Sequence, residues 1–129
     1  ALSRVIDDML DYAYTTVDEI GILKVRPTTQ MQRIASLLRD AAFEIHLATQ
    51  RLQEHPNVAV EHAQRAKALE NRVETVYREA LAELFSGPED VTHVVKMLKK
   101  REVYRHLSNA ADKGDEAANI ISDIVVKIT

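Results

Sequence analysis

Residues 63–85, AQRAKALENRVETVYREALAELF, decide the fold of this chain. Placed at about 100° per residue, the apolar side chains of this stretch fall on one arc of a single helix. A helix with one long apolar arc must bury that arc against other helices. The residues of the arc are Ala66, Leu69, Val73, Val76, Tyr77, Ala80, Leu81 and Leu84.

Two acidic residues, Glu70 and Glu74, fall inside this apolar arc, four residues apart. Burying an ionised carboxylate without a partner costs several kcal/mol. Three arrangements would account for the pair: protonation, an ion pair with Arg or Lys from another helix, or a shared metal ion. Carboxylates at i and i+4 lie one turn apart on one face, so both can reach one ion, and oxygen ligands suit Mg, Mn, Ca or Fe.

The rest of the chain is also expected to be helical, because only 3 Gly and 3 Pro interrupt 129 residues. We predict helices over residues 2–20, 27–54 and about 102–127, with Gly21 near the end of the first helix and a break at Pro56-Asn57. Asp90 is expected to cap a separate short helix. Phe43 and Leu47 lie opposite the main apolar face of the second helix, which predicts packing on two partners. The first helix is expected to pack through Leu2, Ile6, Leu10, Ala13, Val17 and Ile20.

Four long helices with short connections predict an all-α fold, an antiparallel helical bundle that forms a single domain over residues 1–129.

A net charge of −3 gives no general attraction to nucleic acid. The sequence has no cysteine, no signal-peptide pattern and no apolar run near the roughly 18 residues of a membrane span. We therefore expect a cytoplasmic protein. Because the chain lacks a starting Met, we expect a processed or truncated product.

Each predicted long helix carries an acid-x-x-x-acid pair. Asp7 with Asp11, and Asp112 with Glu116, are further candidate metal ligands, although the second pair also fits a solvated polar face. The fourth pair, Asp40 with Glu44, is interpreted as solvated. The five histidines are interpreted as surface residues; they are His46, His55, His62, His93 and His106.

A basic cluster precedes the last predicted helix. It is a candidate site for a phosphate, an acidic lipid or a partner, and the alternative is a solvated helix start. The cluster contains Lys96, Lys99, Lys100, Arg101 and Arg105, of which the first four are the candidate binding residues. The chain has no Glu-x-x-His, Gly-rich phosphate loop or Gly-x-Ser-x-Gly, so we expect no enzymatic activity.

Three segments together resemble a known family. Residues 69–81, LENRVETVYREAL, closely resemble the fifth helix of PhoU-like phosphate transport regulators, and more narrowly the branch that accompanies phosphate transporters of the Pit type. Residues 110–127 resemble the last helix of that family, and residues 7–11, DDMLD, its acidic third-helix motif. The resemblance covers the later two-thirds of the family pattern, so the first helices are expected to be missing.

The resemblance implies a PhoU-like bundle with a multinuclear iron or zinc cluster. Carried over by position, the implied ligands are Asp7, Asp11, Glu70, Glu74, Asp112 and Glu116. The chain departs from the family pattern in having Glu at 74 and 116 in place of Asp, and Ser108 where many relatives have Glu.

The resemblance also implies a non-enzymatic regulator or accessory protein of inorganic phosphate transport. Its partner would be a phosphate transporter or signalling protein, which would bring it to the inner face of the membrane, and we further expect a homo-oligomer. One alternative is a metal-dependent phosphohydrolase or metal-handling protein that uses Glu70, Glu74, Asp112 and Glu116. A third interpretation is a helical oligomerisation module whose paired acids form only salt bridges.

Overall fold

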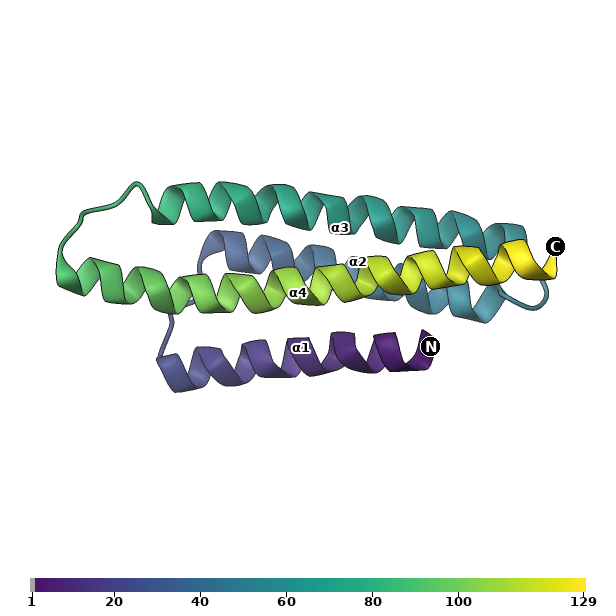
Figure 1. Cartoon of the computed structure of the whole chain (residues 1–129), viewed down its shortest axis with the longest axis horizontal. Coiled ribbons are helices and arrows are strands. Elements are labelled where there is room, and N and C mark those ends of the chain that lie inside the picture. Colours follow the sequence, from purple (N-terminus) through teal and green to yellow (C-terminus); the bar gives the residue numbers. More distant parts are fainter. Residues whose placement is uncertain (1) are drawn as a thin grey trace.

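A computed structural model describes residues 2–129, and these residues form four long helices and no strand (Figure 1). The helices are α1 (Leu2–Leu23), α2 (Thr29–Arg51), α3 (Pro56–Leu84) and α4 (Val91–Ile128). Successive helices run in opposite directions, so the two ends of the chain lie at one end of the bundle and the α1–α2 and α3–α4 connections at the other. The prediction of an all-α antiparallel bundle is confirmed.

The helix starts follow local chemistry. The Thr28 hydroxyl caps α2 by accepting the N–H of Met31 at 3.1 Å, and Asp90 caps α4 by accepting the N–H of His93 at 3.0 Å. Pro56 occupies the first turn of α3, where its missing N–H has no cost. The predicted break at Pro56 is therefore displaced: α2 ends at Arg51, and α3 already begins at Pro56.

The predicted start of the last helix is wrong, whereas the first helix extends three residues beyond its predicted end, with Gly21 near that end as expected. α4 is one continuous helix of 38 residues, not a short helix followed by a long one. No Gly or Pro occurs between Val91 and Lys113, and the Lys, Arg, Leu and Met residues of that segment are strong helix formers. α1 continues through Gly21 to Leu23 and ends because Lys24 adopts the left-handed conformation, with φ of 54°. The N–H of Val25 then reaches the carbonyl of Ile20 at 3.1 Å, as in a Schellman motif.

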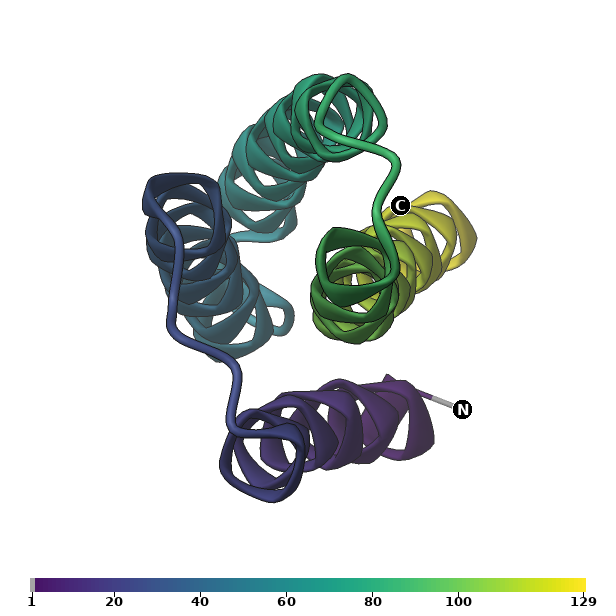
Figure 2. The ribbon, with the colours of Figure 1, turned by 90° about the vertical axis from the view of Figure 1, so that its left-hand side faces the viewer.

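α4 is the helix around which the others are arranged. It packs against α1, α2 and α3, and α2 and α3 pack against each other. Within residues 2–129, α1 makes no close backbone contact with α2 or α3. Viewed along the bundle, α1 lies beside α4, on the side away from α3 (Figure 2). α1 is therefore attached to the bundle mainly through one neighbour.

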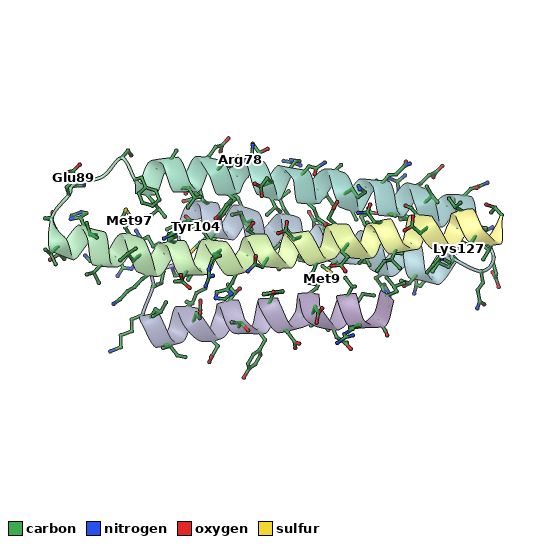
Figure 3. The ribbon with its side chains drawn as sticks, in the orientation of Figure 1. Met9, Arg78, Glu89, Met97, Tyr104 and Lys127 are labelled. Atoms are coloured by element: carbon green, nitrogen blue, oxygen red, sulfur yellow. The ribbon has the colours of Figure 1, made fainter. Side chains whose placement is uncertain are left out.

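The core divides into two clusters along the bundle. One cluster lies near the α1–α2 and α3–α4 connections and includes Tyr104 of α4. Tyr104 reaches toward the start of α2, where its hydroxyl hydrogen-bonds Thr28 (Figure 3). The cluster near the termini is rich in alanine, which lets the helices approach closely. The predicted apolar arc of α3 is confirmed, because it contributes buried residues to both clusters; these are Ala66, Val73, Val76 and Ala80. None of the helices within residues 2–129 is both long and apolar enough to cross a membrane.

Phe43 does not behave as predicted. Its side chain is 60% exposed, and Leu47 is only partly buried. α2 does contact two helices, α3 and α4, but it does so without burying Phe43. The second apolar face of α2 therefore stays open to solvent in this chain.

Candidate functional site

Glu70 lies in the interface between α3 and α4, where it is only 4% exposed. Its carboxyl group lies against Gly114 of α4. A Cβ atom added to Gly114 would be 2.7 Å from Oε1 and 2.9 Å from Oε2 of Glu70, so the absence of a side chain at position 114 makes the room. The prediction that Glu70 faces the core is confirmed.

The Glu70 carboxyl group has no partner, since neither oxygen makes a hydrogen bond. Burial, followed by the negative charges of Asp115 and Asp112, raises the pKa of Glu70 to about 9, and Lys67 opposes this rise. Glu70 is therefore protonated at neutral pH. Of the three arrangements that the sequence left open for the acids on α3, protonation therefore applies to Glu70, and to Glu70 alone.

Glu74, one turn further along α3, has a different environment. Its side chain is 45% exposed and accepts a hydrogen bond from Nε of Arg78 at 3.3 Å. Arg78 lies on the outer side of α3 (Figure 3). The prediction that both acids are buried is thus wrong for Glu74, because its position lies at the edge of the apolar face and not in its middle.

Four carboxyl groups from α3 and α4 line one depression of about 390 Å³, which we call the acidic seam. They are Glu70, Glu74, Asp112 and Asp115. Burial, then the charges of Glu74 and Asp115, raises the pKa of Asp112. Lys67 partly neutralises the seam, with Nζ 3.6 Å from Asp115.

The structure therefore brings together Glu70, Glu74 and Asp112 as predicted, and adds Asp115. The sequence analysis missed Asp115 because it searched for acids at i and i+4. Asp115 follows Asp112 by three residues, a spacing that also places two side chains on one helix face, so a search at i+3 would have found it.

The remaining predicted ligands do not line the seam. Glu116 pairs with Lys113 at 3.2 Å, and Lys113 also lies 3.6 Å from Asp8 of α1. Asp7 and Asp11 are exposed on α1, which packs against α4 but not against α3. The six residues implied by the family resemblance are therefore not assembled at one place.

The arrangement does not fit a multinuclear cluster. Among residues 2–129, no three of the seam carboxylates have ligand atoms within 4.8 Å of one another. Glu70 would also have to lose its proton before it could bind a cation. As it stands, the seam is an acidic surface with one neutral, unpaired carboxyl group at its base.

The predicted basic cluster is larger in the structure than in the sequence. Lys96, Lys99 and Lys100 of α4 surround a depression of about 490 Å³ together with Lys24 and Arg26 from the α1–α2 connection. Arg101 is exposed and does not line it. We call the five cationic lining residues the basic end, because they lie at the end of the bundle opposite its termini; they are Lys24, Arg26, Lys96, Lys99 and Lys100.

An open apolar groove of about 420 Å³ runs between α1 and α2. We define this groove by Leu10, Ala13 and Val17 of α1, Ala35 and Leu38 of α2, and Leu107 of α4. Leu10 is 64% exposed and Val17 is 70% exposed. The prediction that these two side chains pack in the core is wrong, because α1 contacts α4 and leaves its side toward α2 uncovered.

Two histidines predicted to be surface residues are largely buried between helices. Nδ1 of His62 lies 2.6 Å from Oε2 of Glu44, and Nε2 of His106 lies 2.9 Å from Oε1 of Glu19. The side chains of His62, His106 and Glu44 are only 15%, 14% and 21% exposed. Glu44 is therefore not the solvated residue that was predicted.

Comparison with known proteins identifies a distant relative. No family model matches the chain, and no solved structure matches it. The chain is similar to the UPF0111 protein YkaA of Bacillus subtilis, with 25% identity over 128 residues. The match covers 98% of this chain and 61% of that protein, so the chain spans less than two thirds of the length of its relative.

Proposed function

We propose that this chain is a non-enzymatic accessory protein of inorganic phosphate transport that acts by binding a helix of its partner in the apolar groove. The observation that carries this proposal is the exposure of Leu10 and Val17 beside Leu38 and Leu107. Contiguous apolar surface of this kind is typical of interaction sites. A groove between two helices accepts the apolar face of an amphipathic third helix.

The partner class rests on the sequence resemblance. Residues 69–81, 110–127 and 7–11 resemble PhoU-like regulators, and residues 69–81 resemble the Pit-associated branch in particular. A phosphate transporter or its signalling protein is therefore the partner we propose. The similarity to a UPF0111 protein supports relatedness to that protein and does not itself name a transport function.

The basic end and the acidic seam would orient the bundle on its partner. Five cationic side chains at one end favour the anionic inner face of a membrane, where a transporter is embedded. The seam offers Asp112, Asp115 and Glu74 to a basic segment of the partner. Charge of this kind mainly raises the association rate and fixes the orientation.

The test compares two double variants that each replace exposed apolar residues. Leu10→Gln/Val17→Gln removes the apolar wall of the groove, whereas Val126→Gln/Ile128→Gln alters exposed residues at the end of α4. We expect the first variant to lose co-purification with the phosphate transporter and to fail to restore phosphate uptake in a deletion strain. The second variant should still co-purify with the transporter and restore phosphate uptake. Unchanged phosphate uptake on deletion, without any co-purifying transporter, would contradict the proposal.

A second candidate function, metal-dependent phosphoester hydrolysis or metal handling, is favoured by Glu70 alone. A buried acid whose pKa is raised to about 9 beside two other carboxylates is the kind of perturbed group that occurs in active sites. The assay uses purified protein with Mg²⁺, Mn²⁺ or Zn²⁺ and aryl phosphate mono- and diesters. Turnover that Glu70→Gln abolishes would favour this candidate, and no turnover at saturating metal would exclude it in favour of the accessory role.

A further inference from the structure

We infer that Glu19, Glu102 and His106 form a binding site for one divalent transition-metal ion between α1 and α4. None of these residues belongs to the acidic seam or the groove, so this inference is independent of the proposed function. We call the three residues the α1–α4 site.

The site is assembled by helix geometry. Glu102 and His106 lie four residues apart, so they share one face of α4. α1 runs antiparallel to α4 and brings Glu19 to that face. One ligand atom from each of the three residues lies within 4.8 Å of the other two, and this is the one such group of three among residues 2–129.

The distances suit a metal ion. Nε2 of His106 and Oε1 of Glu19 are 2.9 Å apart. Two ligand atoms that bind one ion at roughly 2.0–2.1 Å lie about 2.9 Å apart at an octahedral angle of 90° and about 3.4 Å apart at the tetrahedral angle usual for Zn²⁺. The three ligand atoms lie within 4.8 Å of one another, so they have to close by at most about 2 Å to surround one ion.

The hydrogen bonding between Glu19 and His106 is incomplete. Oε2 of Glu19 and Nδ1 of His106 are buried and have no hydrogen-bond partner. A simple His–Glu pair leaves these two buried atoms unsatisfied, which is unfavourable for a polar group removed from water. An ion that is chelated by both oxygens of Glu19 would give Oε2 a partner. The hydrogen bond between Glu19 and His106 uses only Oε1 and leaves Oε2 without one.

The ligand set selects the class of metal. One imidazole and two carboxylates suit Zn²⁺, Mn²⁺ and Fe²⁺, and two negative charges match a divalent ion. Nη2 of Arg105 donates to Oε2 of Glu102 at 2.8 Å and so holds that carboxylate in place. Three protein ligands leave at least one coordination position to water.

A second buried histidine pair in the chain lacks the third ligand. His62 and Glu44 are 2.6 Å apart and about as buried as His106 and Glu19. Their charged neighbour is Arg65, whose Nη1 lies 4.0 Å from Glu44. Within residues 2–129, no third His, Asp or Glu offers a ligand atom within 4.8 Å of this pair, so His62 is a matched control for His106.

The test measures Zn²⁺ binding by the metal-free full chain, by competition with a chromophoric indicator, and repeats the titration with Mn²⁺. We expect one equivalent of metal in the wild type, in His62→Gln and in the seam variant Glu70→Gln/Asp112→Asn. His106→Gln and Glu19→Gln should weaken binding by at least about 100-fold, more than the loss of an outer-shell partner. Binding by the wild type should also raise its Tm, because the ion joins α1 to α4.

Three results would overturn the inference: no stoichiometric binding by the wild type, equal binding by His106→Gln, or loss of binding in the seam variant alone. Circular dichroism checks that each variant is folded. If His106→Gln does not fold, Glu102→Gln replaces it, because the side chain of Glu102 is 43% exposed and its loss should leave the helices intact. Unchanged Zn²⁺ affinity in Glu102→Gln would then contradict the site.

Discussion

The carboxyl group of Glu70 on α3 occupies the space that a side chain on Gly114 of α4 would fill, with 2.7 Å between Oε1 and an added Cβ. Glycine inside a helix costs about 1 kcal/mol relative to alanine. A buried, unpaired acid costs more. The chain thus carries two locally unfavourable residues at one contact, which is typical of a site kept for function and not for stability.

Gly114→Ala is expected to stabilise the protein only in the background that lacks the Glu70 carboxyl group. In the wild type, the gain in helix propensity of about 1 kcal/mol is offset because the added Cβ displaces the Glu70 carboxyl group. In a Glu70→Ala background the space is free, so the same change should stabilise the protein by about 1 kcal/mol. Urea unfolding of the four proteins in the double-mutant cycle measures the coupling. Equal stabilisation in both backgrounds would show that the two residues are not in contact.

The free energy of unfolding should depend on pH through Glu70. Its pKa is about 9 in the folded state and close to 4.5 in the unfolded chain, so between these values the folded state binds more protons. Stability from this group is therefore full below about pH 4.5 and is lost as pH rises toward 9, by about 1.4 kcal/mol per pH unit. By pH 7 the loss is on the order of 3 kcal/mol.

Glu70→Gln should remove this dependence. The glutamine keeps the shape of the protonated acid, so the variant should match the wild type near pH 4.5 and exceed its stability increasingly toward pH 8. Denaturant unfolding at several pH values gives the difference between the two proteins. A constant difference across this range would mean that Glu70 is ionised in the folded state.

The hydroxyl group of Thr28 should contribute more to stability than the hydroxyl group of Tyr104. Thr28 caps α2 through Met31 and also hydrogen-bonds Tyr104. Thr28→Val loses both interactions and should cost about 2 kcal/mol, whereas Tyr104→Phe loses one and should cost about 1 kcal/mol. Thr75→Val, at an exposed hydroxyl on α3, is the control and should change stability by less than about 0.5 kcal/mol. The reverse order in thermal or urea unfolding would contradict this account of the α2 start.

Anion binding should be located at the basic end. We expect weak, salt-sensitive binding to vesicles that contain anionic phospholipid, because the lining residues are all cationic or apolar. Lys24→Gln/Lys96→Gln/Lys99→Gln should abolish it in a sedimentation assay. Arg65→Gln/Arg72→Gln/Lys127→Gln changes the net charge equally at other places and should retain binding. Equal loss in both triple variants would indicate a general charge effect.

The sequence predicted the helices themselves better than it predicted which helices pack against one another. The period of residues 63–85 identified Glu70 and the buried arc of α3, because one face of a long amphipathic helix is defined locally. The same kind of pattern misassigned Leu10 and Val17, since apolar spacing does not distinguish a packed face from an open groove. It also divided α4 in two, because the run of charged residues near Lys99 was taken for the start of a helix.

Contacts between distant residues were the part that sequence reasoning did not reach. His106 and Glu19 are 87 positions apart, and only the antiparallel packing of α1 on α4 brings them together. The closeness of Gly114 to Glu70 likewise depends on the packing of α4 on α3. A glycine or a histidine in the sequence does not by itself indicate which distant acid it will lie against in the fold.

Site-specific photo-crosslinking tests the central claim most directly. A benzoylphenylalanine residue is placed at Leu10 in the groove, or at Val126 as an exposed control, in cells that naturally produce the chain. We expect position 10 to crosslink to the phosphate transporter or its signalling protein, identified by mass spectrometry, and position 126 not to do so. Crosslinking of the two positions to the same proteins, or of position 10 only to a second copy of the chain, would contradict the proposed role of the groove.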